Sequence, residues 1–307
     1  MYKENSISTS QLFCILLLCR LSAEIVYPRT VAGTAREGII ALVIAEILRF
    51  ILALPVIIYS FKGTNIHRAV YKKNKLFGWC GALFAALLLC GAALRTLLNS
   101  SQFAVKNLLN GGTIWIIFAI SAIFAVYAAV MGIESLARSG AIFLMAAALI
   151  TLTVILADIP YMQTDGFAAR GDFKALLGDT FERVMRGGDY LIFAALLPYV
   201  GKKNKSSAGS SVLWFAAGSL LGGLMITVTS CLVLRDMYGL CEYPHIAAAS
   251  LADIAFFKRL DGASAAVWTL CAAFRSGVML FAAGSAVVEV YRAGHTAAGK
   301  KIQRGAE

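Results

Sequence analysis

Charged side chains lie inside several long apolar stretches of this sequence, where a charge is costly and usually has a specific role. Arg20 and Glu24 are four residues apart, so a helix would place both on one face. Glu46 and Arg49, three residues apart, would also share a helix face. Partners at these spacings neutralise each other locally, and the same groups can bind a polar ligand or a coupled ion inside a membrane.

Arg275 lies in the middle of another apolar stretch and has no acidic neighbour there. Its guanidinium stays charged and therefore needs a partner from a different part of the chain. Asp189 and Glu24 are the candidates. Three roles remain open for Arg275: a structural pair between helices, a ligand-binding or coupling role, and a position facing water.

Two of the apolar stretches are interrupted. In the first, the residues from Arg20 to Glu24 follow a short run of apolar side chains. In the second, the segment 183–189 precedes an apolar run, 190–200, which as a helix spans only about 16 Å and cannot cross a membrane alone. Unwound turns at matching places in two halves of a chain are typical of transporter-type binding sites, because they free backbone groups to hold a carboxylate or a cation. The alternative is that the second stretch simply begins late, at an outer vestibule.

These observations predict one ligand site inside the membrane. We expect it beside both interruptions, with facing walls from residues 90–94 and 271–275. Small residues there let a ligand approach, and helix N-termini suit a carboxylate. The predicted ligand-binding residues are Ser22, Ala23, Glu24, Gly187, Gly188, Asp189 and Arg275.

Enzymatic motifs are not found in the sequence. It has no nucleophile–base set, phosphate-binding loop, dinucleotide fingerprint or HExxH motif. Most of the seven cysteines lie in apolar runs without CxxC spacing, which indicates small buried side chains rather than zinc ligands or disulfides. His67, His245 and His295 fall in connectors or tails. We therefore expect no enzyme activity, no metal and no cofactor.

The composition places these residues in a polytopic membrane protein. Hydrophobic residues make up 59% of the 307 residues and charged residues only 15%, with a mean hydropathy of +0.76. Soluble domains have about a quarter charged residues. The net charge of +11 comes largely from short connectors, which indicates membrane topology rather than nucleic-acid binding.

Apolar runs of about 20 residues span a bilayer as helices. The continuous runs show no alternation with period two, which favours helices over a barrel. We predict an all-α membrane protein whose residues 1–293 form a single transmembrane domain and whose residues 294–307 form a polar cytoplasmic tail. The predicted spans lie near 10–28, 38–60, 76–98, 112–131, 139–160, 184–201, 211–234 and 263–290.

The connectors also predict an orientation. Lys and Arg are concentrated in both tails and in the connectors 61–75 and 202–205, so the positive-inside rule places both termini in the cytoplasm. The outer segment 235–262 has apolar residues at helical spacing and predicts a short interfacial helix. The glycines at 218, 222 and 223 form a small-residue stripe that favours close helix packing.

Several sequence segments are similar to a known family. They are Ile7–Phe13, Tyr127–Ser139, Leu197–Tyr199, Tyr243–Pro244 and Arg259–Asp261. Within the second, Gly132–Arg138 (GIESLAR) is the most specific. Together they resemble the endospore germination permease family, the B-type subunit of nutrient germinant receptors, in the amino acid–polyamine–organocation superfamily.

The resemblance implies a LeuT-type inverted-repeat fold of ten spans, of which the last two are not found here. It implies a spore inner-membrane protein that works with an A-type membrane subunit and a C-type lipoprotein. The expected function is to bind a small nutrient, such as an amino acid, and help trigger germination. A cation- or proton-coupled amino acid permease and a shortened scaffold subunit without ligand are the alternatives. The nutrient itself is not specified by the sequence.

Overall fold

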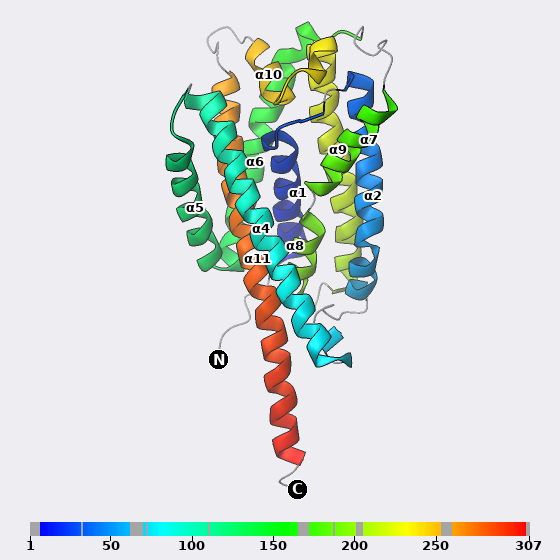
Figure 1. Ribbon diagram of the computed structural model, residues 1–307, viewed down its shortest axis with the longest axis vertical. Coiled ribbons are helices and arrows are strands. Elements are labelled where there is room, and N and C mark those ends of the chain that lie inside the picture. The colour runs from blue at the N-terminus through cyan, green and yellow to red at the C-terminus, as the bar shows by residue number, and fades with distance from the viewer. Residues whose placement is uncertain are drawn as a thin grey trace.

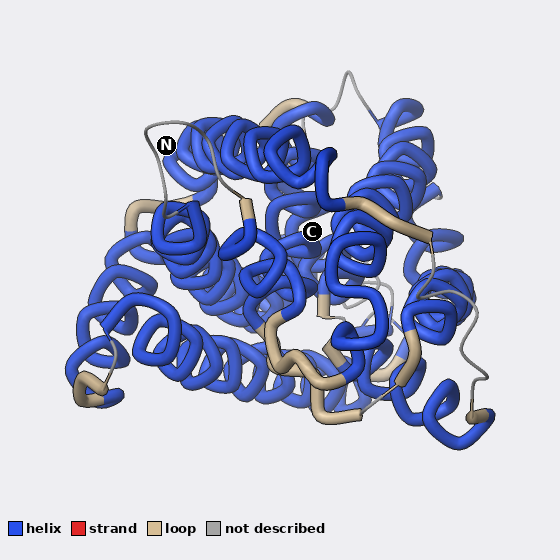
Figure 2. The backbone as a smooth tube through the Cα atoms, turned by 90° about the horizontal axis from the view of Figure 1, so that it is seen from above, coloured by secondary structure: helices blue, strands red, loops and turns tan. Residues whose placement is uncertain are grey.

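The structure is a computed structural model, described over residues 7–31, 33–61, 70–71, 73–109, 111–164, 172–186, 188–200, 205–252 and 260–304. Within these residues the backbone forms helices joined by short loops (Figure 2), and the only β-type contact is an isolated bridge between Ile7 and Val200. The predicted all-α membrane class is confirmed.

The described helices follow the predicted apolar runs closely. Six of them are long and apolar enough to cross a membrane: α1, α2, α4, α6, α9 and α11. A shorter apolar helix, α5, lies within the predicted fourth span, and α8 lies within the predicted sixth, whereas α7 lies almost entirely before that span. In chain order the helices are α1 (Thr9–Val26), α2 (Ala35–Phe61), α4 (Lys75–Ala104), α5 (Ile114–Val130), α6 (Ile133–Asp158), α7 (Phe173–Met185), α8 (Asp189–Leu196), α9 (Lys205–Leu234), α10 (Pro244–Leu251) and α11 (Leu260–Arg304).

The long helices run roughly side by side as a bundle (Figure 1). The start of α1, the end of α2, the start of α4 and the end of α11 all lie toward one end, and α10 lies at the other. The helix ends that flank both tails and the connector 61–75 thus lie toward one end of the bundle, and the cytoplasmic placement of that end stays a prediction. With 45 residues, α11 is about 67 Å long, more than twice the hydrocarbon thickness, and it extends beyond the other helices.

Helix α1 lies in the middle of the bundle and packs against α6, α9 and α11. Outward-facing positions carry exposed apolar side chains such as Leu76, Phe84, Ile123 and Trp214. An apolar outer surface is what contact with lipid acyl chains requires. The packed core and the apolar outer surface therefore both follow from the high content of hydrophobic residues.

The ends of α1 are set by local sequence. The Ser8 hydroxyl accepts a hydrogen bond from the Gln11 backbone N–H, and the Gln11 side chain accepts one from the Ser8 backbone, which forms a capping box. Extended backbone at Tyr27, directly before Pro28, ends the helix. The Ile7 N–H also donates to the Tyr199 carbonyl at 2.9 Å, which fixes the start of α1 to the segment that follows α8.

The predicted interruption of the first span is wrong. Helix α1 continues through Ser22, Ala23 and Glu24 without a break. The charges that suggested an unwound turn are neutralised by side-chain pairs, so the backbone keeps its helical hydrogen bonds. The predicted break in the sixth span is confirmed, because α7 ends at Met185 and α8 begins at Asp189.

The glycine stripe of α9 packs as predicted. A Cβ added at Gly222 would lie 2.9 Å from Leu21 Cδ2 of α1, closer than side chains normally approach. A Cβ at Gly223 would lie 3.3 Å from Leu42 Cδ1 of α2. Glycine at these positions lets α9 approach both helices closely.

The predicted short helix in the outer segment is α10, although part of the segment, 253–259, lies outside the described residues. Helix α10 packs on α9 and α11 and buries His245, Ile246 and Ala249. It therefore covers one end of the bundle instead of exposing a broad face to the surroundings.

Candidate functional site

Buried ion pairs join α1 to α2. Arg20 bonds to Glu24 at 3.1 Å and to Glu46 at 2.8 Å, and Arg49 bonds to Glu46 at 2.6 Å. Both pairs expected from the sequence spacing are thus present, and Arg20 links them across the helix interface. At most 8% of any of these side chains is exposed, so the charges satisfy one another rather than water.

Helix α7 extends this set of ion pairs. Arg183 bonds to Glu24 of α1 and, at 3.3 Å, to Asp179 one turn earlier in its own helix. Arg29, in the segment after α1, reaches Asp179 at 3.4 Å. We call these residues, together with Arg20, Glu46 and Arg49, the ionic layer. Asp179, Arg183 and Arg29 are not among the predicted site residues, because the bonds that bring them to α1, from Arg183 to Glu24 and from Arg29 to Asp179, join residues distant in the chain.

Arginines also bond to the carbonyl groups at the C-terminal end of α7. Arg49 Nη2 donates to the Arg183 carbonyl at 2.6 Å, and Arg275 Nη2 donates to the Arg186 carbonyl at 2.9 Å. The side chain of Arg186 donates to the Pro28 carbonyl at 2.9 Å. The last carbonyls of a helix have no partner in their own helix, and guanidinium groups from α2 and α11 supply one here.

Asp189 and Arg275 form a buried pair directly beyond the break, as the sequence suggested. Arg275 Nη2 lies 3.6 Å from Asp189 Oδ1, and the two side chains are 1% and 2% exposed. This contact is longer than a hydrogen bond. Both Asp189 carboxylate oxygens, together with Nε and Nη1 of Arg275, are buried without any hydrogen-bond partner. The pair therefore neutralises charge but leaves much of its hydrogen-bonding capacity unused.

Tyr27 forms one wall beside this pair. Its ring lies 5.6 Å from the guanidinium carbon of Arg275 and 5.4 Å from that of Arg95. The Tyr27 hydroxyl hydrogen-bonds to Thr96 Oγ1 of α4 at 2.8 Å. The predicted α4 wall needs correction: Cys90 and Leu94 are exposed, and the inward-facing residues are Ala93 and Thr96. In α11, Cys271 and Arg275 face inward as predicted.

The small residues predicted for the site do not lie together around one space where the structure describes them: Ser22 and Ala23 are in α1, and Gly188 directly precedes α8. The Ser22 hydroxyl bonds back to the Cys19 carbonyl at 2.9 Å, and Ala23 is buried in α1. Gly188 precedes α8, but its φ of −115° does not require glycine, and a Cβ there would make ordinary contact with Met279 Cε at 3.5 Å. Gly187 lies outside the described residues.

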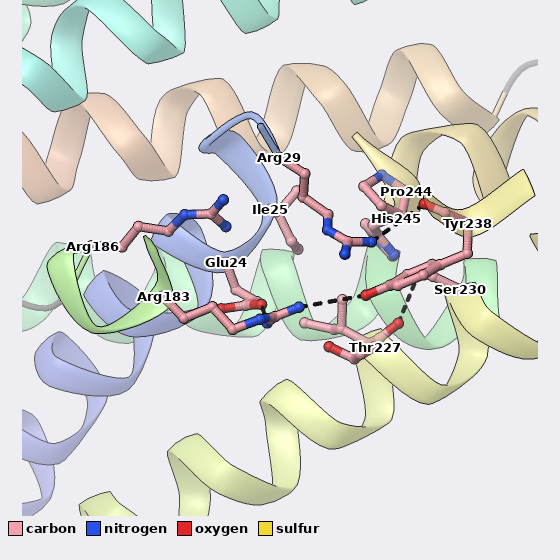
Figure 3. Close-up of a pocket in the computed structure, with 11 residues that line it drawn as sticks. Glu24, Ile25, Arg29, Arg183, Arg186, Thr227, Ser230, Tyr238, Pro244 and His245 are labelled. Atoms are coloured by element: carbon pink, nitrogen blue, oxygen red, sulfur yellow. Dashed lines mark hydrogen bonds and ion pairs between the residues drawn. The ribbon is translucent and has the colours of Figure 1, made fainter. Parts of the chain in front are cut away.

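A small cavity lies next to the ionic layer, where α10 covers the bundle (Figure 3). Its volume is about 20 Å³, enough for one or two water molecules. In Figure 3 the Glu24 and Arg183 side chains point toward each other, and Arg183 also bonds to the Tyr238 hydroxyl. Among the predicted ligand residues that the structure describes, only Glu24 lines this cavity. The lining residues are Glu24, Ile25, Arg29, Arg183, Arg186, Ile226, Thr227, Ser230, Tyr238, Pro244 and His245.

His245 falls in a connector by the sequence pattern, but in the structure it belongs to α10 and lines the cavity. It is 4% exposed, and neither ring nitrogen has a hydrogen-bond partner. Burial lowers the pKa of His245 to about 4, because the charged form is poorly solvated there. The imidazole is therefore neutral at pH 7.

Comparison with known proteins decides the family. Residues 6–297 match the spore permease family, whose members are described as spore germination proteins. The chain belongs to this spore germination protein family. A search of curated proteins gave no significant match.

Membership of the spore germination family agrees with the resemblance carried by the GIESLAR segment. The family is of permease type and is not a known enzyme family. In the part of the chain that the structure describes, no group of three His, Cys, Asp or Glu side chains could hold a metal ion. Asp189 and Arg275 are buried charged groups beside a helix break, and several of their polar atoms have no hydrogen-bond partner. Such groups suit the binding of a polar solute.

Proposed function

We propose that this germination family protein binds a small zwitterionic nutrient, an amino acid, at the Asp189–Arg275 pair. The observation that supports this proposal is the set of unmet hydrogen-bonding atoms: two carboxylate oxygens of Asp189 and two guanidinium nitrogens of Arg275, all buried. Unmet buried polar atoms cost about 1–3 kcal/mol each, so a guest that satisfies them gains that free energy.

An amino acid backbone has the complementary groups. Its carboxylate accepts hydrogen bonds from Nε and Nη1 of Arg275, in the geometry that favours guanidinium–carboxylate pairs. Its ammonium group donates to Asp189. The start of α8 next to Asp189 adds a favourable partial positive charge for the carboxylate. Tyr27, whose ring lies 5.6 Å from the Arg275 guanidinium carbon, and Met279, which lies next to Gly188, are buried beside this pair, and we expect them to contact the nutrient side chain and contribute to selectivity.

The proposal also includes a cellular location and partner subunits for this protein as part of a germinant receptor. A nutrient-binding member of the family would sit in the spore inner membrane with both termini in the cytoplasm. It would act with an A-type membrane subunit and a C-type lipoprotein. This placement is supported by family membership, by the Lys and Arg bias of the tails and by the common end of the bundle at which α1 starts and α11 ends.

Germination of spores carrying Asp189→Asn or Arg275→Lys variants, scored against a panel of amino acids, sugars and nucleosides, tests the proposal. We expect the amino acid concentration for half-maximal response to rise at least about tenfold, the effect of losing one charge-assisted hydrogen bond. Arg138→Gln is the matched control, because its pair with Glu134 is exposed. Binding of labelled amino acid to the purified protein should weaken in parallel. An unchanged response from variants that accumulate normally would contradict the proposed site.

A coupled amino acid permease is the second candidate, because the same unbonded Asp189 oxygens suit a transported proton or cation. Uptake of labelled amino acid into proteoliposomes distinguishes the two functions. Concentrative uptake that depends on a proton or sodium gradient supports the permease. Saturable binding without uptake supports the receptor, and neither binding nor uptake supports a scaffold subunit.

A further inference from the structure

A carboxylate without a partner lies at the end of α6, away from the proposed nutrient site. Asp158 is the last residue of α6 and is 0% exposed. Neither of its carboxylate oxygens has a hydrogen-bond partner, and among the described residues no arginine or lysine pairs with it. The carboxylates of the ionic layer each bond to an arginine, whereas Asp158 has no positive charge to neutralise it.

Apolar side chains surround this carboxylate. The buried cluster next to it comprises Val154, Ala157, Ala249, Ala252 and Leu260. Helix α10 lies over this end of the bundle (Figure 1) and packs against both α6 and α11. Both Asp158 oxygens are enclosed, and Asp158 does not line the cavity beside the ionic layer. A water molecule or metal ion therefore has no room against these oxygens, and a proton is the one ligand that needs none.

The end of α6 also disfavours a negative charge. The last carbonyl groups of a helix carry partial negative charge, and Asp158 adds its carboxylate at this end. Pro160 has no N–H, so the Leu156 carbonyl lacks its usual helical donor and stays electron-rich. An ionised carboxylate that is buried without a partner is so unfavourable that such a group takes up a proton instead.

The titratable groups on the neighbouring elements do not supply the missing positive charge. His245 of α10 is neutral at pH 7, because burial lowers its pKa. Asp261 at the start of α11 is acidic, and Tyr161, directly after α6, is a neutral phenol. Arg235 and Asp236, which follow α9, do not bond to Asp158. The charged groups of α1 are paired within the ionic layer. Asp253, Lys258 and Arg259 lie in the segment 253–259, outside the described residues.

We propose that Asp158 is a proton-binding site: it holds one proton while α10 covers this end of the bundle, and α10 must move away before the proton is released. The site does not depend on the proposed nutrient site, where Arg275 supplies the charge opposite to Asp189. The covered state binds the proton more tightly than an uncovered or unfolded state. Low pH therefore stabilises the covered state, and high pH weakens it.

Thermal unfolding of the purified full-length protein in detergent, compared between the parent protein and Asp158→Asn, tests this site. Asparagine is neutral at every pH and close in shape to the protonated acid. We expect similar unfolding midpoints at about pH 5.5 and a higher midpoint for Asp158→Asn at about pH 8.5, where the parent must bury an ionised carboxylate. The contribution of His245 has the opposite sign, but it is common to both proteins and cancels in the difference.

The opposite result at high pH has a clear meaning. A carboxylate paired with a cation, such as one from the segment 253–259, would make Asp158→Asn less stable than the parent at about pH 8.5, and that result would overturn the proposal. Asp236→Asn is the matched control, because Asp236 is an exposed aspartate at the same end of the bundle. Its difference from the parent should not depend on pH.

Infrared difference spectroscopy detects the proton directly. At about pH 6, where exposed aspartates are ionised, the parent and Asp236→Asn should show the carbonyl stretch of a protonated carboxylic acid, and Asp158→Asn should lack it. A parent spectrum without an acid band that depends on Asp158 would overturn the assignment, whatever the stability measurements give.

Movement of α10 is followed by the maleimide reaction of Ala249→Cys, above the background of the native cysteines. The ratio of its rate at about pH 8.5 to that at about pH 6 should be at least about tenfold larger with Asp158 than with Asp158→Asn. Thiol ionisation also speeds this reaction at high pH, but it does so in both proteins. Equal ratios in the two proteins would refute the link between proton release and α10.

Discussion

Replacing Arg275 with leucine removes the positive partner from a buried carboxylate. Breaking a buried pair by deleting one partner costs about 3–5 kcal/mol, because the remaining charge is left unpaired. The Arg186 carbonyl also loses its donor at 2.9 Å, which adds about 1–3 kcal/mol. Leucine inserts into a membrane more favourably than arginine by about 3 kcal/mol, so the net loss expected for Arg275→Leu is about 3 kcal/mol.

Such a loss is a large part of the stability of a typical protein domain. Membrane abundance and the unfolding midpoint in detergent should both fall for Arg275→Leu. The double variant Arg275→Leu with Asp189→Asn should recover much of the loss, since no unpaired charge then remains. Arg138→Leu is the control, because it breaks an exposed pair worth about 1 kcal/mol or less. Normal abundance and an unchanged midpoint for Arg275→Leu alone would show that Asp189 does not depend on this guanidinium.

Three further predictions follow from packing, topology and titration. Gly222→Val should lower abundance by forcing α9 away from Leu21, an overpacking cost of about 1–3 kcal/mol, whereas Gly188→Ala should accumulate normally; equal abundance of the two would refute this contrast. A cysteine introduced at Lys73 should react with an impermeant maleimide only after permeabilisation, and labelling of intact cells would reverse the orientation. In the Asp158→Asn protein, stability should fall as the pH drops from about 6.5 toward 4, because the folded state must then bury a charged His245, and His245→Leu should flatten this decline.

The sequence specified the helices and the local ion pairs because both depend on short-range patterns. Most of the long apolar runs lie in helices, although α11 extends 14 residues beyond the predicted end of its span and the predicted sixth span contains a helix break. The spacings of Arg20 with Glu24, and of Glu46 with Arg49, were enough to predict bonds that the structure contains. The sequence also predicts the pairing of Arg275 with Asp189, because few acidic residues lie next to the apolar stretches and could serve as a partner.

The interruption expected in α1 failed for a tertiary reason. Two charged side chains in an apolar run are unfavourable inside a membrane, but the sequence of that run does not show which residues elsewhere neutralise them. Glu46 of α2 and Arg183 of α7 complete the bonds of Arg20 and Glu24, so α1 does not need to unwind. The cavity at His245 was missed for a similar reason, because α10 becomes buried only when the segment after α9 folds back on the bundle.

The same tertiary contacts explain why the break between α7 and α8 is stable. A broken helix inside a membrane exposes carbonyl groups that lipid cannot satisfy. Here Arg49 and Arg275 donate to the carbonyls of Arg183 and Arg186, so guanidinium groups from two other helices hold the broken end. Arg275 therefore makes two contacts: it donates a hydrogen bond to the Arg186 carbonyl at the end of α7, and it pairs with the Asp189 carboxylate. A ligand carboxylate that engaged its free nitrogens would act directly on the group that holds the end of α7, which links occupancy of the site to the position of that helix.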